Sequence, residues 1–300
     1  MQKIQERLRA LKEREKAVIL AHYYAPDAVQ AIADRVGDSY YLAKEAAKTQ
    51  AETIVFCGVH FMGESAKILN PGKRVLMPDL SADCPMAHMA SAEQIAALKR
   101  EVGDLAVVCY INSTAELKAM SDVCVTSSNA VKIVRALKEQ NILFIPDQNL
   151  GSFVAEKVPE KHFYFSGGYC PVHASLLAAD VAAEKAAHPQ AEVLTHPECT
   201  EEVRALSDFI GSTAEIIARA RESAAREFIV CTEPGVLFEL KNDCPDKHFI
   251  PVSMACADMK KNTLERVLEC FETGAGEVVT DAAKAESARR PLERMLELAK

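Results

Sequence analysis

Short runs of apolar residues alternate along the chain with segments in which apolar residues recur every three or four positions. The continuous runs are typical of buried strands, and the three-to-four spacing predicts amphipathic helices. The runs that we expect to form strands are AVILA, TIVFC, RVLM, LAVVC, ILFI, HFYF, EVLT, EFIVC and HFIPV. Because strands and helices alternate, the sequence predicts parallel sheets with helices on their faces.

Three segments align without gaps, which indicates an internal repeat. They are HYYAPDAVQAIADRVGDS from His22, YINSTAELKAMSDVCVTS from Tyr110 and HPECTEEVRALSDFIGST from His196, and their starting points lie 88 and 86 residues apart. One matched column holds an aspartate in every copy, and the last column holds a hydroxyl residue. These positions are Asp34, Asp122 and Asp208, and Ser39, Ser127 and Thr213. We expect the aspartates to be structural and to bond nearby backbone.

The repeat predicts an α/β fold of three pseudo-symmetric units around a central active site. Each unit is expected to be a three-layer α/β/α arrangement with a short parallel sheet, built from three of the strands named above. The expected boundaries are 1–103, 104–190 and 191–276, and residues 277–300 are expected to form a C-terminal helix that packs back on the body. No linker rich in Gly, Pro or Ser separates the units, so tight fusion is expected.

Charge and hydropathy exclude some kinds of partner. The chain has 300 residues with 35 Lys and Arg against 43 Asp and Glu, a net charge of −8, and no basic tract that would favour nucleic acid. No stretch approaches the roughly 18 apolar residues of a membrane helix. The charged start MQKIQERLRALKERE does not resemble a secretory signal. We therefore expect a cytoplasmic protein without nucleic acid or membrane partners.

The chain carries ten cysteines, and in an unexported protein these are poor candidates for a disulfide framework. One cysteine follows the third strand of each unit, at Cys84, Cys170 and Cys256, with 86 residues between neighbours. Equivalent positions should meet at the pseudo-threefold axis, where three thiolates can hold a metal or an iron–sulfur cluster. Three protein ligands would leave one iron of a cubane open as a Lewis acid. The alternative is that each is an inert loop cysteine.

The remaining cysteines are expected to pack as small apolar residues. They are Cys57, Cys109, Cys124, Cys199, Cys231, Cys244 and Cys270.

Polar residues follow the first strand of each unit, where ligands bind in parallel sheets. They are His22 and Tyr24, Tyr110 and Asn112, and His196 and Glu198. Histidine, glutamate and tyrosine can move protons, although each could also be a hydrogen-bonded structural residue.

The hydroxyl column of the repeat suits helix N-caps, and helix N-termini also bind anions. Three such termini could hold a polyanionic substrate in an acidic protein. Ser128, Ser212 and Asn129 could assist, and His173 in CPVH is a further site candidate.

The chain resembles the quinolinate synthase family of NAD biosynthesis nearly end to end. The matching motifs are ILAHYY, IADRVGDS, VFCGVHFMGESAKILNP, YINSTAELKAMSDVCVTSSNAVKIV, PDQNLG, CPVH, HPEC, GST and MKKNTLE. The resemblance implies three pseudo-symmetric α/β domains around a central cavity, and a [4Fe-4S] cluster on Cys84, Cys170 and Cys256. It implies Tyr24 close by and these substrate-binding residues: His22, Ser39, Tyr110, Ile111, Asn112, Ser127, His173, His196, Pro197, Glu198, Ser212 and Thr213.

The chain departs from the family pattern in two places. Asp83 precedes the first cysteine ligand, where a smaller residue is expected, and the C-terminal cysteine cluster of some members is absent.

The resemblance implies a transferase that condenses iminoaspartate with dihydroxyacetone phosphate. The products are quinolinate, phosphate and two waters, after carbon–carbon bond formation, dehydration and cyclisation. The open iron would polarise a leaving hydroxyl, and the candidates for proton transfer are Glu198, His196, Tyr24 and His22. Iminoaspartate would be supplied by L-aspartate oxidase or aspartate dehydrogenase.

Other functions remain open at this stage. The same open iron would suit another [4Fe-4S] hydro-lyase acting on a small dicarboxylate, and a non-enzyme alternative is an iron–sulfur sensor or scaffold. Three thiolates could also hold zinc. A Cys-x3-Cys-x2-Cys run, which radical-SAM chemistry would need, does not occur in the sequence.

Overall fold

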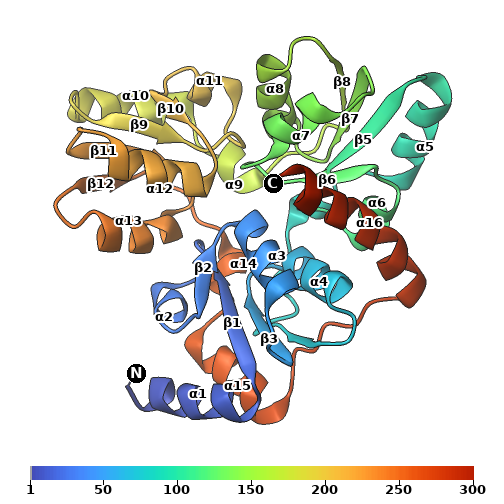
Figure 1. Ribbon diagram of the computed structural model, residues 1–300. Coiled ribbons are helices and arrows are strands. Elements are labelled where there is room, and N and C mark those ends of the chain that lie inside the picture. The colour runs from blue at the N-terminus through green and yellow to red at the C-terminus, as the bar shows by residue number, and fades with distance from the viewer. Residues whose placement is uncertain (1) are drawn as a thin grey trace.

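The computed structural model describes residues 2–300 and contains three four-stranded sheets, each flanked by helices. The three sheet-and-helix bodies lie around a common centre, and the C-terminal end of the chain returns to that centre (Figure 1). Every strand pair in the three sheets is parallel. The predicted α/β class with three repeated units is therefore confirmed.

The sheets share one topology, in which the first strand of each unit lies between its second and third strands. The first sheet has the order β2-β1-β3-β4, with β1 at Ala17–His22, β2 at Arg35–Gly37, β3 at Thr53–Cys57 and β4 at Arg74–Leu76. The second has the order β6-β5-β7-β8, with β5 at Leu105–Tyr110, β6 at Val123–Val125, β7 at Asn141–Ile145 and β8 at His162–Phe165. The third has the order β10-β9-β11-β12, with β9 at Glu192–Thr195, β10 at Phe209–Ile210, β11 at Glu227–Cys231 and β12 at His248–Pro251.

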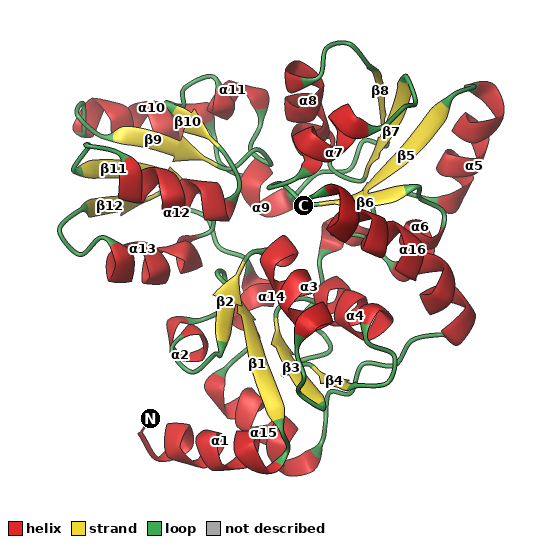
Figure 2. Cartoon of the chain, viewed as in Figure 1, coloured by secondary structure: helices red, strands yellow, loops and turns green. Residues whose placement is uncertain are grey.

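Helices separate these strands and cover the sheets (Figure 2). Around the first sheet they are α1 Gln2–Arg14, α2 Asp27–Gln30, α3 Ser39–Lys48 and α4 His60–Leu69. Next come α5 Ala92–Glu101, α6 Ala115–Ala119, α7 Ala130–Ala136, α8 Gln148–Lys157, α9 Pro171–Ala174 and α10 Ala178–Ala187. The last are α11 Glu201–Arg204, α12 Thr213–Glu222, α13 Leu237–Asp243, α14 Ala257–Lys260, α15 Leu264–Thr273 and α16 Ala282–Leu298. Two 3-10 turns lie at Pro85–His88 and Pro234–Val236.

The expected strands all form, but the prediction of three strands per unit is wrong. Each sheet gains an edge strand, β2, β6 or β10, where a helical pattern was expected. The helical pattern yields only the short helices α2, α6 and α11. The residues of these edge strands continue the three-to-four spacing of the preceding segment, as at Val29, Ile32 and Val36, which explains the difference.

The repeated aspartates join the edge strand to the central strand in the same way in each unit. Asp34 Oδ2 accepts the Ile19 backbone N–H at 2.9 Å, Asp122 Oδ2 accepts that of Val107 at 2.8 Å, and Asp208 Oδ2 accepts that of Val193 at 2.9 Å. The expected structural role of these aspartates is confirmed.

The C-terminal helices cross from one unit to another. α15 packs on α1 and β3 of the first unit, and α16 packs on α4, α6 and β6. Arg289 and Arg294 of α16 donate to the carbonyls of Ile68 and Asp122. These helices therefore tie the first unit to the rest of the chain, while the unit boundaries themselves stay a prediction.

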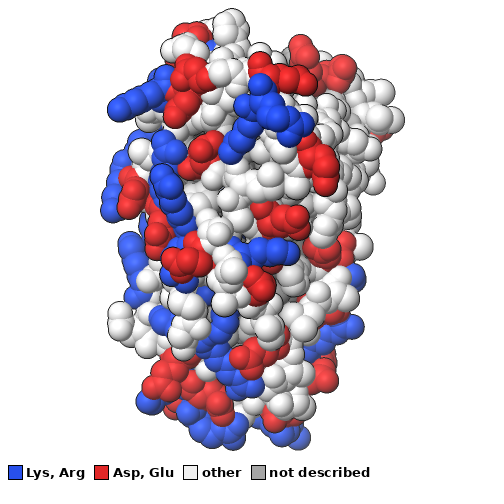
Figure 3. Space-filling view, turned by 90° about the vertical axis from the view of Figure 1, so that its right-hand side faces the viewer, with Lys and Arg blue, Asp and Glu red and all other residues white. Residues whose placement is uncertain are grey.

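The charge on the surface and the length of the helices bear on whether nucleic acid or membrane is a partner. Basic and acidic side chains are intermixed on the face that Figure 3 shows, rather than gathered into one basic area. Within residues 2–300, the helices are too short or too polar to cross a membrane.

Candidate active site

A cavity of about 240 Å³ opens where the carboxyl ends of β1, β5 and β9 converge. All three units contribute to its wall, as expected for ligand sites in parallel sheets. The sequence-predicted residues on the wall are His22, Tyr24, Ser39, Cys84, Tyr110, Asn112, Ser127, Cys170, His173, His196, Glu198, Thr213 and Cys256. Ile111, Pro197 and Ser212 are absent from the wall; Ile111 lies in the core and Ser212 caps α12.

The three repeat cysteines occupy the same local structure. Cys84 precedes the 3-10 turn, Cys170 precedes α9 and Cys256 precedes α14, each as the N-cap residue. Burial raises the pKa of all three thiols, and neighbouring negative groups, including Glu198 for Cys84 and Cys170, raise them further. Three thiolates here would need a positive partner. The donor set therefore fits a cationic metal group with sulfur ligands.

The three cysteine sulfurs do not form a closed ligand set in this structure. Tetrahedral Zn–S bonds of about 2.3 Å would bring the sulfurs to about 3.8 Å from one another. Among residues 2–300, the group of three possible ligands within 4.8 Å of one another is instead Cys170, His173 and Glu198.

The other seven cysteines are packing residues, as expected. All are 5% exposed or less, and they lie in the strands and in the buried contacts between elements.

Glu198 is the buried anion of the cavity. Its Oε1 accepts the Tyr110 hydroxyl at 2.5 Å and its Oε2 accepts His173 Nδ1 at 2.7 Å. Burial alone would raise its pKa, but the charge and hydrogen bond of His173, the nearby His196 and the Tyr110 hydroxyl outweigh burial and lower the pKa. Glu198 is therefore an ionised carboxylate inside the protein.

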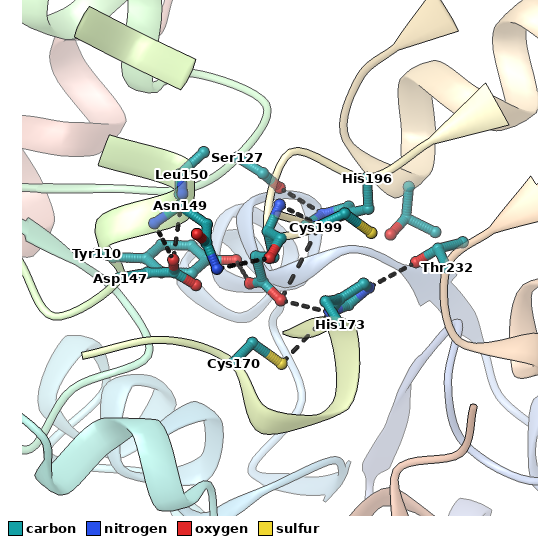
Figure 4. Close-up of polar contacts among 12 residues, drawn as sticks. Tyr110, Ser127, Asp147, Asn149, Leu150, Cys170, His173, His196, Cys199 and Thr232 are labelled. Carbon is teal, nitrogen blue, oxygen red and sulfur yellow. Dashed lines mark hydrogen bonds and ion pairs between the residues drawn. The ribbon is translucent and has the colours of Figure 1, made fainter. Parts of the chain in front are cut away.

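A chain of hydrogen bonds leads from Glu198 to Tyr24 of the first unit. His173 Nε2 lies 3.0 Å from Thr232 Oγ1, a contact that Figure 4 shows, and Thr232 Oγ1 lies 2.7 Å from the Tyr24 hydroxyl. Tyr24 also bonds Thr213 Oγ1 at 2.7 Å. Each link is short enough to pass a proton. The chain joins residues from all three units.

Sequence reasoning missed Thr232, which carries the middle of this chain. Its equivalents in the other units are Gly58 and Pro146, so the repeat holds no polar signal at this position. Asp38, Thr126 and Glu233 also line the cavity and were not predicted.

His22 and His196 are equivalent in the repeat and share one geometry. The Tyr24 backbone N–H donates to His22 Nδ1 at 3.1 Å, and the Glu198 backbone N–H donates to His196 Nδ1 at 3.3 Å. Burial lowers the pKa of each imidazole to about 3. Both rings are therefore neutral at pH 7, with Nδ1 as acceptor and Nε2–H as donor. His196 points this donor at Ser127 Oγ, 3.3 Å away.

The expected helix caps lie at neighbouring positions. α3 is capped by Asp38, which accepts the Tyr41 N–H, and α12 is capped by Ser212, which accepts the Glu215 N–H. Since the residue before each carries the cap, Ser39 and Thr213 are free to line the cavity. Ser127 lies two residues before the N-cap Asn129 of α7, so its prediction as a cap is also wrong.

Asn112 presents an acceptor without a partner. Its Oδ1 is buried, and within residues 2–300 no donor lies in hydrogen-bonding reach. A buried amide oxygen on a cavity wall is well suited to accept a hydrogen bond from a ligand.

The two neutral histidines predict a loss of stability in acid. Their folded pKa values lie below the unfolded value of about 6.5, so their contribution is complete above pH 6.5 and declines as the pH falls toward 3. Each should cost about 1.4 kcal/mol per pH unit in that window. We expect the free energy of unfolding, measured with denaturant, to fall between pH 6.5 and 4.5.

The double variant His22→Gln, His196→Gln should flatten this slope. The exposed His248 provides the control, because His248→Gln should leave the slope unchanged. An equal slope in the double variant and the unaltered protein would contradict the assignment of neutral imidazoles.

Comparison with known proteins gives a consistent result. A family model described as "Quinolinate synthetase A protein" matches residues 6–297. The quinolinate synthase of Caldicellulosiruptor saccharolyticus is 49% identical over 300 residues, 99% of each chain. That of Fusobacterium nucleatum subsp. nucleatum is 48% identical over 297 residues, 99% of each chain, and that of Clostridioides difficile is 47% identical over 294 residues, 97% of each. The cavity with its repeated cysteines and the full-length similarity lead to one conclusion: the chain belongs to the quinolinate synthase family.

Proposed function

We propose that this protein is a quinolinate synthase of NAD biosynthesis, a transferase that condenses iminoaspartate with dihydroxyacetone phosphate. The products are quinolinate, phosphate and two waters. The observation that carries the proposal is the joint wall of one cavity. Cys84, Cys170 and Cys256 line the same space as the ionised Glu198 and the donor Tyr24.

The resident group in this proposal is a [4Fe-4S] cluster held by the three cysteines. The proposal is supported by the equivalent repeat positions of the three cysteines and by their common place on the cavity wall. When bound, such a cluster supplies an iron without a protein ligand, which acts as a Lewis acid on a leaving hydroxyl.

Substrate binding is assigned to the donors around the cavity. Both substrates are anionic, and α3 and α12 present their N-termini near the wall through Ser39 and Thr213. The Nε2–H groups of the neutral His22 and His196 can donate to carboxylate or phosphate oxygens. In this arrangement the two histidines bind and orient the substrates, with Ser127 and Asn112 beside them.

Proton transfer is assigned to the chain that begins at Tyr24. The burial of its hydroxyl raises its pKa well above 10, so Tyr24 is a neutral donor. A proton lost to substrate can be replaced through Thr232 and His173, and a proton gained can leave along the same path toward Glu198. The contact between Glu198 Oε2 and His173 Nδ1 orients the His173 ring so that Nε2 faces Thr232. Condensation and dehydration both need such transfers.

The remaining parts of the proposal concern the cell. In a cytoplasmic location, L-aspartate oxidase or aspartate dehydrogenase would supply the iminoaspartate.

Anaerobic reconstitution with iron and sulfide tests the proposal. The loaded protein should form quinolinate only when both substrates are present, and metal analysis should find iron with equimolar sulfide rather than zinc. Dehydration of another small dicarboxylate, without need for the triose phosphate, would support a hydro-lyase instead. A loaded protein that turns over neither substrate would contradict the enzyme assignment.

A further inference from the structure

Two buried carboxylates stand at equivalent places in the second and third units. Asp147 and Glu233 lie 86 residues apart, each two residues after the end of its strand, β7 or β11. Each precedes the cysteine of its own unit, Cys170 or Cys256, by 23 residues. Both side chains are fully buried. The match in spacing and burial suggests one shared task.

Glu233 connects several backbone and side-chain groups. Its Oε2 accepts the Gly235 N–H at 2.7 Å, and its Oε1 contacts Lys260 Nζ at 2.8 Å. Oε1 also accepts the backbone N–H of Cys256 at 3.4 Å. Glu233 therefore fixes the turn in which it lies and the loop that carries the third cysteine.

Lys260 extends this connection to the first unit. Its Nζ donates to the Tyr24 carbonyl oxygen at 2.8 Å, while it pairs with Glu233. Gln30 Nε2 crosses the same seam, donating to the carbonyls of Tyr23 and Gly235 at 2.8 and 3.0 Å. A Cβ at Gly235 would lie 2.7 Å from the Tyr23 carbonyl oxygen, so the two backbones approach closely there. The seam thus sets Tyr24 against the Cys256 loop.

Asp147 does the corresponding task in the second unit. Its Oδ1 accepts the backbone N–H groups of Asn149 and Leu150 at 2.8 and 3.1 Å. Its Oδ2 is buried without a hydrogen-bond partner among residues 2–300, and burial together with Glu198 raises the pKa of this carboxyl group. The turn is joined to the loop before Cys170 through the backbone, because the Gln148 N–H donates to the Gly168 carbonyl at 2.8 Å.

In the first unit a different residue holds the loop of the cysteine. Val59 occupies the equivalent position, and there Asp83 Oδ1 accepts the backbone N–H of Cys84 at 2.8 Å. A carboxylate therefore accepts the N–H of Cys84 and of Cys256, while the loop of Cys170 is held through the backbone at Gly168. A nearby negative charge disfavours a thiolate, so the carboxylates of Asp83 and Glu233 do not serve to activate the sulfur. Their contacts instead fix the peptide from which the cysteine side chain projects.

We propose that Asp147 and Glu233 are positioning residues, each holding the cysteine loop of its own unit, and that Glu233 also aligns Tyr24 with Cys256 through Lys260. This inference rests on the proposed three-cysteine site. It does not depend on the identity of the substrates.

The test measures alkylation of the metal-free protein by iodoacetamide, with the rate at each cysteine read by peptide mass spectrometry. Glu233→Gln should raise the rate at Cys256 at least threefold relative to Cys84 and Cys170. Asp147→Ala removes the acceptor of the Asn149 and Leu150 N–H groups, so it should raise the rate at Cys170 and leave Cys256 unchanged. Glu233→Asp keeps the charge but shortens the side chain by one methylene, so it should also release Cys256.

Two controls separate positioning from a general loss of stability. Glu192→Gln removes the partner of Arg219 in the same unit, away from the cavity, and should change no cysteine rate. In the reconstituted enzyme, Glu233→Gln should lower kcat about tenfold, with KM for each substrate changed less than threefold. Equal effects on all three cysteines, or none, would overturn the proposal, whether or not the protein makes quinolinate. If the alkylation pattern holds without quinolinate formation, only the proposed function fails.

Discussion

Cys84→Ala is expected to remove both the brown absorbance of the reconstituted protein and its turnover. The alanine leaves two thiols on the cavity wall, and two do not suffice to hold the cluster that we propose for three cysteines. Because the hydroxyl-activating iron would be lost with the cluster, no quinolinate should form. Iron and sulfide content, the visible spectrum and the quinolinate assay together measure the effect.

The matched control is Cys244→Ala. Cys244 is 5% exposed and packs in the third unit away from the cavity, so the same chemical change should cost about 1 kcal/mol of stability and keep the cluster. A Cys84→Ala variant that is colourless yet active would contradict the Lewis-acid role. Loss of colour in both variants would show that the cluster is sensitive to packing rather than to ligation.

The sequence predicted the structure best at the positions that recur in all three units. The three cysteines and the structural aspartates occupy repeated positions. The same structural role therefore selects the same residue type three times in the sequence. The other nine strands could also be predicted, because continuous apolar runs are typical of strands buried on both faces. The short edge strands β2, β6 and β10 have no such apolar run, and the helical spacing of their residues led to a wrong prediction of helix.

The chemistry between units was the least predictable part. Glu198 bonds Tyr110 of β5 and His173 of α9, which lie far from it in the sequence, and the pairing depends on how the units dock. Thr232 has no polar equivalent in the other units, so neither spacing nor residue type marked it. The caps of α3 and α12 lie one residue before the predicted positions, because the Asp38 and Ser212 side chains accept the free N–H groups there in place of Ser39 and Thr213.

Glu198→Gln is expected to lower kcat by about 10²- to 10⁴-fold, the usual range for loss of a proton-transfer group. The carboxylate accepts from Tyr110 on one oxygen and from His173 on the other. An amide has one acceptor oxygen, so it must turn an N–H toward one of these donors. Either His173 or Tyr110 then loses its hydrogen-bond acceptor, and the hydrogen-bond chain to Tyr24 is interrupted. The three cysteines are untouched, so the visible spectrum and iron content should remain.

Thr232→Val shows whether this loss reflects the chain or the local site. Valine matches threonine in shape but removes the hydroxyl that links His173 to Tyr24. We expect about a tenfold fall in kcat, with KM and cluster content unchanged. Because both changes break one chain, the double variant should be little slower than Glu198→Gln alone. Multiplicative losses in the double variant would show that Glu198 and Thr232 act independently, and the relay would then be wrong.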